Sequence, residues 1–430
     1  MNKNLKEKRT LWVLICLIGI VFVYGCSKEG KIAEKKVTIR YANWEVFPAQ
    51  LKLHQEVVDK FRDKHPEINL KFDIVHGGIQ KILVEMAAGA GPDVFYCCDA
   101  LILAPLVEKK VVIDISPYIK EDITLGDYFP NIMEGMRYKD GIYGFPIYLG
   151  TTALIYNKSL FDKEGMAYPS QDWYWEDFVE AAKKLTKREE GKTIQYGADK
   201  PGYYDVIRSF GGDFFNAETT VCTLDSPETR DALQFILDLQ NKYRVIPSIT
   251  ELEGEDKFKS GVQMFMDGRI GMFIAPSFIL PTLRDIKNFE WDVAPMPKRN
   301  GKKIISSFGA GILCISSQSK HLKEAWEFVK FACGREGVSI FGKGRNSVPP
   351  IRDVAYATFS PPPENIRVFV DIIEAGDYSP PFPKVIWANE FFSEAVQPEI
   401  DLLFLNKQSE EETIRKISAK ANRYLKPVTE

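Results

Sequence analysis

From residue 37 onward, strand-like and helix-like segments alternate in a regular order, which constrains the fold more than any other sequence feature. The strand-like segments alternate apolar with polar side chains or form short apolar runs rich in β-branched residues. The helix-like segments repeat apolar side chains at a spacing of three and four residues. The expected elements are strands at 37–41, 68–75 and 93–96 and helices at about 49–64 and 79–89. This order predicts an α/β lobe with a largely parallel sheet.

The chain has 430 residues, which is more than one such lobe requires and enough for two or three domains with separate cores. Hydrophobic residues make up 45% and charged residues 27%, which excludes a chain that is disordered throughout. The formal net charge of −3 argues against nucleic acid as a partner. Further helices are expected at 172–185, 226–240, 321–332, 393–405 and 411–425, and further strands at 151–156 and 308–315.

The N-terminal residues indicate export. Basic residues precede an uncharged stretch from residue 11 to residue 25, which is shorter than the roughly 20 residues of a membrane span and typical of a signal peptide. The stretch ends in Val23-Tyr-Gly-Cys26, which resembles a bacterial lipobox. We therefore expect a signal peptide at 1–25, palmitate-type lipidation of Cys26, and a polar tether at 26–36. An uncleaved anchor helix, or a cleaved secretory signal with a chance cysteine, remains the alternative.

The usual signatures of metal and catalytic sites are missing from the sequence. Five cysteines follow Cys26, so at least one is unpaired unless chains pair with one another, and none has CxxC spacing. The four histidines show no ligand spacing, and no GxSxG motif is present. Residues 337–344 approach a phosphate-binding loop, but Gly344 stands where Ser or Thr would hold Mg²⁺. We expect neither metal nor cofactor, and no enzymatic activity.

Eight segments, taken in order, resemble the extracellular solute-binding proteins of ABC transporters, family 1, the sugar-binding and maltodextrin-binding relatives. Two examples are Gly141-Ile-Tyr-Gly-Phe-Pro146 and Met266-Asp-Gly-Arg-Ile-Gly-Met272. The matching segments are 41–45, 87–95, 141–146, 154–161, 173–178, 222–228, 266–273 and 325–331. They cover nearly all of residues 37–350.

The resemblance implies a clamp of two α/β lobes joined by a hinge that closes around a ligand. The chain is expected to cross between the lobes more than once, near 146–150, 295–304 and 342–349, where glycine and proline are frequent. The expected bounds are 37–147 with 300–340 for lobe 1, and 148–299 with 341–430 for lobe 2.

A sugar presents apolar C–H faces and a ring of hydroxyl groups, which proteins meet with aromatic rings and planar polar side chains. Such groups are expected on loops at strand ends, where α/β sheets open to ligands. In lobe 1, Trp44 follows the first strand and is expected as a stacking platform, with core packing as the alternative. The other lobe 1 and crossover candidates are Glu45 and Asp99 as hydroxyl acceptors, Tyr148 and Thr151, and main-chain amides at Gly309 and Ala310.

The second lobe supplies further candidates. Tyr203 and Tyr204 could stack on the ligand, and Ser277-Phe278 stands where many relatives carry a tryptophan platform. Trp387 is an isolated aromatic residue that either stacks on the ligand or packs within the lobe. Arg345 and Asn346, on the last crossover, could donate to hydroxyl groups.

Together these features predict an extracytoplasmic carbohydrate-binding component of an ABC importer, anchored by lipid to the bacterial cell membrane. The protein is expected to act as a monomer, to close around a sugar without breaking a bond, and to deliver it to the permease subunits. Two alternatives stay open: the same fold with a polyol phosphate, peptide or polyamine as ligand, and an exported glycosidase.

Overall fold

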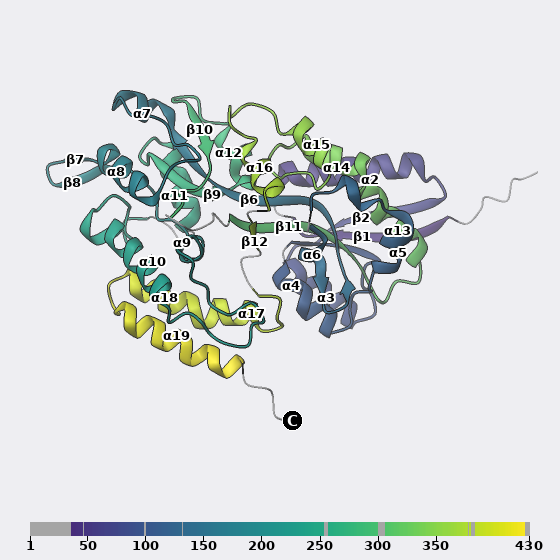
Figure 1. Ribbon diagram of the computed structural model, residues 1–430. Helices are drawn as coiled ribbons and strands as arrows, with labels where there is room; N and C mark the ends of the chain where they lie inside the picture. The colour runs from purple at the N-terminus through teal and green to yellow at the C-terminus, as the bar shows by residue number, and fades with distance from the viewer. Residues whose placement is uncertain are drawn as a thin grey trace, which may run out of the picture.

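The computed structural model describes residues 36–45, 47–98, 100–130, 132–252, 257–299, 306–376, 378–379 and 383–425. Within these ranges the chain forms two α/β lobes that lie side by side and are joined by strands running between them (Figure 1). This architecture confirms the predicted two-lobed α/β fold. The predicted signal peptide, the lipidation site Cys26, Asp99 and all of the tether except Lys36 lie outside the described residues.

The first lobe is built around three parallel strands, which alternate with helices along the chain as the sequence predicts. β1 (Val37–Asn43) lies between β2 (Ile68–Ile74) and β3 (Val94–Cys98), and α2 (Pro48–Lys64) and α3 (Gly78–Ala87) connect them. The other elements of this part of the chain are α4 (Ala100–Glu108), α5 (Ser116–Asp122), η1 (Leu125–Asp127), α6 (Ile132–Met136), β4 (Arg137–Tyr138), β5 (Gly141–Ile142), α13 (Leu322–Cys333), α14 (Arg335–Gly342), α15 (Arg352–Thr358) and α16 (Val368–Glu374).

The second lobe surrounds a shorter antiparallel part of the sheet. Its core is rich in aromatic residues; Trp175 is buried, and its indole N–H donates to the hydroxyl of Ser209 at 2.9 Å. The elements of this lobe are α7 (Lys158–Lys163), α8 (Trp175–Leu185), β7 (Lys187–Glu189), β8 (Lys192–Gln195), α9 (Tyr203–Phe210), α10 (Pro227–Leu237), η2 (Asp238–Lys242), α11 (Lys257–Met266), β9 (Met272–Pro276), η3 (Ser277–Ile279), α12 (Leu280–Leu283), β10 (Trp291–Ala294), α17 (Ala388–Glu390), η4 (Phe391–Val396), α18 (Gln397–Phe404) and α19 (Glu410–Tyr424).

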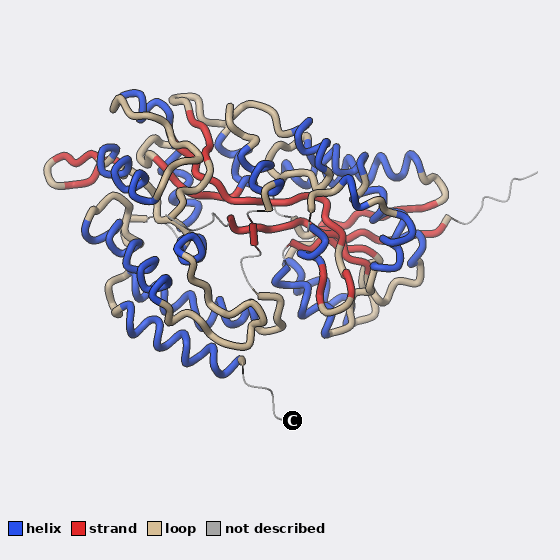
Figure 2. Tube along the Cα trace, viewed as in Figure 1, coloured by secondary structure: helices blue, strands red, loops and turns tan. Residues whose placement is uncertain are grey.

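One long strand belongs to both lobes. β6 (Phe145–Asn157) pairs with β11 (Ser306–Ile315) through residues 145–151 and with β9 and β10 through residues 152–157. β11 in turn pairs with β3 of the first lobe and with the short β12 (Tyr378–Ser379). Figure 2 shows these strands as an unbroken connection through the middle of the molecule. We refer to β6 and β11 as the hinge strands.

The two faces of β6 differ in what covers them. Successive side chains of a strand point to opposite faces, so Tyr148, Gly150 and Thr152 share one face and Leu149 and Thr151 share the other. Thr151 is fully buried, and its hydroxyl donates to the main-chain carbonyl of Phe369 in α16 at 3.2 Å. The face with Thr151 is therefore a packing face, and only the face with Tyr148, Gly150 and Thr152 is left to bind a ligand.

Residues 341–376 stay beside the hinge strands. Val348 pairs with Leu149 of β6, and the main-chain N–H of Asn365 donates to the carboxylate of Asp292 in β10 at 2.9 Å. From α17 onward the chain packs into the second lobe, where Phe391 and Phe404 are part of the core. Residues 341–376 therefore contact elements of both lobes, and from α17 onward the chain lies in the second lobe.

Among the described residues, no helix combines the length and apolar character needed to cross a membrane. The same part of the chain contains no cluster of three or more histidine, cysteine or acidic side chains that could hold a metal ion.

Candidate ligand-binding cleft

Two glycines lie opposite each other on the hinge strands and form the floor of the candidate cleft. Gly150 of β6 lies opposite Gly309 of β11, and directly opposed residues of an antiparallel pair project to the same face. A Cβ at Gly309 would meet no described atom within 4 Å, and one at Gly150 would meet only the carbonyl oxygen of Gly309, at 3.8 Å. The missing side chains leave space directly above the hinge.

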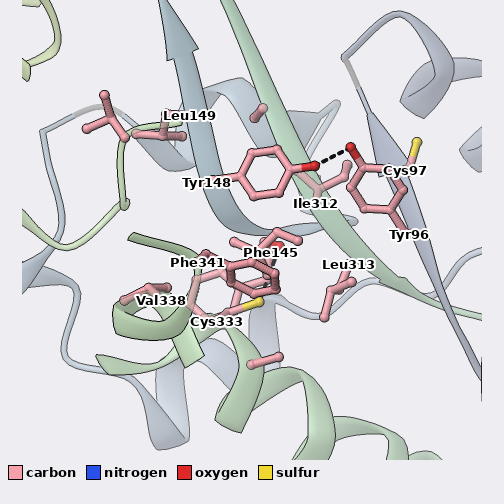
Figure 3. Packing of buried hydrophobic residues seen from close by; sticks show 14 of the residues in the cluster. Tyr96, Cys97, Phe145, Tyr148, Leu149, Ile312, Leu313, Cys333, Val338 and Phe341 are labelled. Atoms are coloured by element: carbon pink, nitrogen blue, oxygen red, sulfur yellow. Dashed lines mark hydrogen bonds between the residues drawn. The ribbon is translucent and has the colours of Figure 1, made fainter. Parts of the chain in front are cut away.

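The wall in the first lobe contains a carboxylate held by two phenols. Figure 3 shows Tyr148 of β6 and Tyr96 of β3 pointing toward each other, and their oxygens lie 2.5 Å apart. Tyr148 and Tyr96 also lie within hydrogen-bond distance of one carboxylate oxygen of Glu45, at 3.1 Å and 3.3 Å. The tyrosines are buried and Glu45 is half-buried, so the carboxylate is the member of this group that solvent reaches.

Trp44 completes this wall. It is half-buried at the end of β1, and its ring packs against Tyr96 with ring centroids 5.6 Å apart. Its indole Nε1 is buried and has no hydrogen-bond partner among the described residues. Trp44 and Glu45 therefore place a half-buried aromatic ring and an acceptor group side by side after the first strand.

A buried histidine supports the two tyrosines. His54 of α2 lies edge-on to Tyr96 at 5.4 Å and to Tyr148 at 6.4 Å, and its Nδ1 is 2.9 Å from the hydroxyl of Tyr41. Burial lowers the pKa of His54 to about 3. The ring is neutral at physiological pH and acts as packing beneath the wall, without adding charge to it.

The second lobe contributes a cavity of about 650 Å³. This volume falls within the ~300–1,000 Å³ typical of small-molecule sites. Thr152 of β6 lines the cavity together with Ile274 and Pro276 of β9, and these three residues share one face of the sheet. The full lining is Thr152, Asp199, Lys200, Pro201, Gly202, Tyr203, Asp205, Ile249, Leu252, Ile274, Pro276, Gln397, Asp401 and Leu405.

Four of the lining residues are charged: Asp199, Lys200, Asp205 and Asp401. Burial raises the pKa of Asp199 to about 6, although the main-chain N–H and the charge of Lys200 act in the opposite direction. Burial lowers the pKa of Lys200, partly offset by the charges of Asp401 and Asp199. The Nζ of Lys200 lies 4.5 Å from the ring centroid of Phe404. The cavity thus offers both hydrogen-bond donors and acceptors on a largely desolvated surface.

The structure brings together only part of the predicted site. Trp44, Glu45 and Tyr148 form one wall, Gly309 lies on the floor, and Tyr203 lines the cavity of the second lobe. Thr151 points to the opposite face of β6, so its neighbour Thr152 takes the position that we expected for it. A shift of one residue along a strand exchanges the two faces, which explains this error.

The side chain of Tyr204 is also turned away from the cleft, and the side chain of Ala310, whose main-chain amide was the expected donor, is buried. One residue along a helix rotates the side chain by about 100°, which directs Tyr204 into the core of the second lobe. There its ring stacks on Phe214 at 5.4 Å and it is only 8% exposed. Ala310 is buried and pairs with Leu149 on the packing side of the hinge strands.

Of the two residues predicted just after β9, one is buried in the protein and the other is exposed. Ser277 is fully buried, with its hydroxyl lacking a hydrogen-bond partner among the described residues. Phe278 is 40% exposed, and its ring lies 5.8 Å from that of Phe47 at the start of α2. Because α2 belongs to the first lobe, Phe278 lies where the two lobes meet and does not line the cavity.

The predicted donors on the last crossover bind the protein itself. The guanidinium of Arg345 donates to the carbonyls of Ser360 and Pro361 at 3.2 Å and 2.9 Å. Asn346 is buried and its amide donates to Gln50 at 3.3 Å. Both side chains stabilise the crossover segment and neither lines the cavity.

Trp387 packs within the second lobe, which was the alternative to a ligand platform. Its ring lies 5.4 Å from those of Phe215 and Tyr424 and 5.8 Å from that of Phe391.

Six polar residues of the cavity were not predicted from the sequence: Thr152, Asp199, Lys200, Asp205, Gln397 and Asp401. One signal was available for two of them, because Asp199-Lys200 directly precedes Pro201-Gly202 and the start of α9, and such strand-to-helix loops commonly bind ligands. Asp401 carries no comparable signal, because it lies inside a helix two hundred residues further along the chain.

Comparison with known proteins places this architecture in a family. The family described as "Bacterial extracellular solute-binding protein" matches residues 49–338. A binding protein of Brucella abortus (strain 2308) is 22% identical over 384 residues, covering 86% of this chain and 89% of the relative. The arabinooligosaccharide-binding protein of Bacillus subtilis (strain 168) is 24% identical over 351 residues, covering 77% of each chain.

Among solved structures, the ABC substrate-binding protein Lmo0181 from Listeria monocytogenes, in complex with cycloalternan, superposes with a TM-score of 0.79. It is 24% identical in sequence, and the match covers 91% of this chain and 99% of that one. The shared architecture agrees with the family match, which spans both lobes and the hinge strands. The protein therefore belongs to the bacterial extracellular solute-binding proteins.

Proposed function

We propose that the protein binds an oligosaccharide in the cleft between its lobes and delivers it to the permease of an ABC importer. One observation carries this proposal: the wall of Trp44 and Glu45 and the cavity beside Thr152 share one face of β6. They are separated by the open glycine pair Gly150–Gly309. From Tyr148 to Thr152 the strand spans roughly 13 Å, a distance that suits a ligand of several rings.

The chemistry of the two sides complements a sugar. The indole of Trp44 offers an apolar surface for a C–H face, and the carboxylate of Glu45 accepts from hydroxyl groups. The cavity of the second lobe adds acceptors at Asp199 and Asp401 and a donor at Lys200. The names of the relatives support this assignment, because the Bacillus subtilis protein is an arabinooligosaccharide-binding protein and the Listeria monocytogenes structure holds cycloalternan.

Binding is proposed to proceed by lobe closure without any chemical change to the ligand. A ligand that contacts both lobes binds the closed state more tightly than the open one and so shifts the population toward closure. The hinge strands are the connection about which the lobes would rotate. We propose that lobe 1 comprises 37–151 and 306–376, and that lobe 2 comprises 152–299 and 383–425.

The cellular setting follows from the N-terminal sequence. We propose that residues 1–25 are removed as a signal peptide and that Cys26 carries the lipid that anchors the protein, as a monomer, outside the cytoplasmic membrane. Several acyl chains give stable attachment where a single chain gives only marginal binding. A lipid label that is incorporated by the wild-type protein and lost in Cys26→Ser would support the anchor, and equal labelling would contradict it.

A thermal-unfolding panel tests the ligand class. Neutral oligosaccharides, sugar phosphates, polyamines and short peptides are each added to the purified protein. A ligand at 100 times its dissociation constant stabilises the native state by about 2.7 kcal/mol. We expect stabilisation by at least one neutral oligosaccharide. A response confined to phosphates, polyamines or peptides would replace the proposed ligand, and turnover of a chromogenic glycoside would indicate an enzyme.

A further inference from the structure

Lys200 lines the cavity of the second lobe. The hydrogens of its ammonium group have no acceptor among the described residues. It is half-buried, and its nearest described feature is the ring of Phe404, 4.5 Å from Nζ. The contact is a cation–π interaction, which attracts the charge without accepting a directed hydrogen bond. The Nζ is therefore open to the cavity, where an oxygen of a bound ligand could accept its hydrogens.

Two carboxylates flank this ammonium without forming an ion pair within the described residues. Asp199 accepts the main-chain N–H of Lys200 at 2.8 Å, and Asp401 accepts the side-chain amide of Gln397 at 2.8 Å. Both line the same cavity, as does a third acid, Asp205. Among the described lining residues, the charged groups are therefore three carboxylates and one ammonium. Within this set Lys200 lies among acids and does not form a basic patch.

We propose that Lys200 donates hydrogen bonds to a bound sugar and that Asp199 and Asp401, which flank it, determine specificity by rejecting acidic sugars. The inference rests on the proposed function and adds the substrate class. The ammonium donates to a ring or hydroxyl oxygen of the bound sugar, while the neighbouring carboxylates accept hydroxyl hydrogens on either side. A uronate or a phosphate could reach Lys200 only by bringing its negative charge next to those carboxylates.

Repulsion between like charges excludes acidic ligands, whereas the hydrogen bonds from Lys200 give affinity. The two roles are separable in this cavity because different residues perform them. Loss of Lys200 should weaken neutral and acidic ligands alike, since both use its hydrogens. Loss of the flanking charges should leave neutral ligands bound while admitting acidic ones. A cavity in which Lys200 only packs on Phe404 would show neither pattern.

Isothermal titration of the full-length protein with matched ligand pairs tests the inference. The neutral probes are maltotriose, β-1,4-mannotriose, xylotriose and arabinotriose. The acidic probes are the uronic acid counterparts of the first two and trigalacturonate. We expect the wild type to bind at least one neutral probe, and to bind every acidic probe at least tenfold more weakly.

Lys200→Met keeps the aliphatic stem on Phe404 and removes the donors. Hydrogen bonds to charged groups are worth enough to predict a roughly 10- to 150-fold loss of affinity for the neutral probe. Lys200→Arg should recover part of that loss. The double variant Asp199→Asn/Asp401→Asn should raise affinity for the acidic counterpart at least tenfold. Lys407→Met, an exposed position of the same lobe, removes the same charge and is the matched control.

Three outcomes distinguish a failure of this inference from a failure of the proposed function. Binding of a neutral probe with the expected response of the variants supports the inference. Binding of a neutral probe with equal affinity for its acidic counterpart, or with unchanged affinity in Lys200→Met, overturns the inference and leaves the proposed function standing. Absence of binding to every saccharide overturns the proposed function and the inference with it. Unfolding temperatures of all variants identify any that fail to fold, and the single variant Asp401→Asn then replaces the double one.

Discussion

Lys384 of the second lobe donates a hydrogen bond of 3.2 Å to the main-chain carbonyl of Arg137 in the first lobe. The same ammonium also donates to the carbonyl of Glu134, so one side chain holds the C-terminal end of α6. Burial lowers the pKa of Lys384. In Figure 1, α17 approaches α4 below the hinge strands. Besides the contact of Phe278 with Phe47, the lobes therefore also touch through Lys384.

Lys384→Met should favour the open state. We predict that a rotation about β6 and β11 that separates the lobes would break the bonds from Lys384 to the carbonyls of Glu134 and Arg137, so that these bonds favour closed lobes. A net contribution of about 1 kcal/mol for a partly exposed group predicts roughly fivefold weaker sugar binding. Small-angle scattering of the unliganded variant should give a larger radius of gyration than the wild type. Lys407→Met should change neither quantity, and a Lys384→Met variant with wild-type affinity would contradict a role in closure.

Tyr148→Phe should weaken ligand binding while preserving the fold. The substitution removes the hydroxyl that lies 3.1 Å from Glu45 and 2.5 Å from the hydroxyl of Tyr96, but keeps the ring over Gly311. Glu45 then has one phenol fewer to orient it, which predicts a loss of about fivefold in affinity by calorimetry. Tyr168→Phe, at an exposed position, is the control. Equal affinity in Tyr148→Phe and wild type would show that Glu45 does not contact the ligand.

His54 should make the protein less stable in acid. Its folded-state pKa of about 3 lies below the ordinary value of 6.5. Between pH 6.5 and 3 the unfolded chain therefore binds a proton at this position that the native state does not. The free energy of unfolding should fall by up to about 1.4 kcal/mol per pH unit as the pH decreases through this window.

Denaturant titration of His54→Phe at several pH values isolates this effect. The comparison uses the slope of stability against pH, so a uniform loss of stability in the variant does not affect it. We expect a shallower slope than wild type between pH 6.5 and 3, and no change of slope in His76→Gln, where the histidine is exposed. Parallel slopes for His54→Phe and wild type would show that the buried ring takes up its proton in the native state.

The sequence was sufficient for the strand and helix order of the first lobe and for the wall that follows β1. Trp44 and Glu45 were identifiable because they come directly after a strand with clear alternation, where a parallel sheet opens to ligands. Trp175 lies at the start of a helix with clear apolar spacing, and the structure buries it against Ser209. The local sequence pattern was enough in these cases because one strand or one helix alone determines where each residue lies.

The cavity of the second lobe could not be predicted from local sequence patterns. Lys200 and Asp401 meet only because α18 packs beside the loop that precedes α9. The sequence also does not show which face of β6 is buried, because Thr151 and Thr152 both carry a hydroxyl group. Only the position of α16 shows that Thr151 is the covered one. The crossover residues Arg345 and Asn346 were misassigned for a related reason, because their partners come from distant parts of the chain.

Two glycines on one strand should respond in opposite ways to the same substitution. At Gly309 an added Cβ meets no described atom within 4 Å, whereas at Gly311 it would lie 2.3 Å from the ring of Tyr148. Gly309→Ala should therefore fold with unchanged or slightly higher stability, because alanine restricts the unfolded chain more than glycine. Gly311→Ala should lose about 1–3 kcal/mol through overpacking. Gly309→Val should fill the floor of the cleft and lower sugar affinity at least tenfold in a protein that unfolds at the wild-type temperature. Full affinity in a folded Gly309→Val variant would place the ligand elsewhere than above the hinge strands.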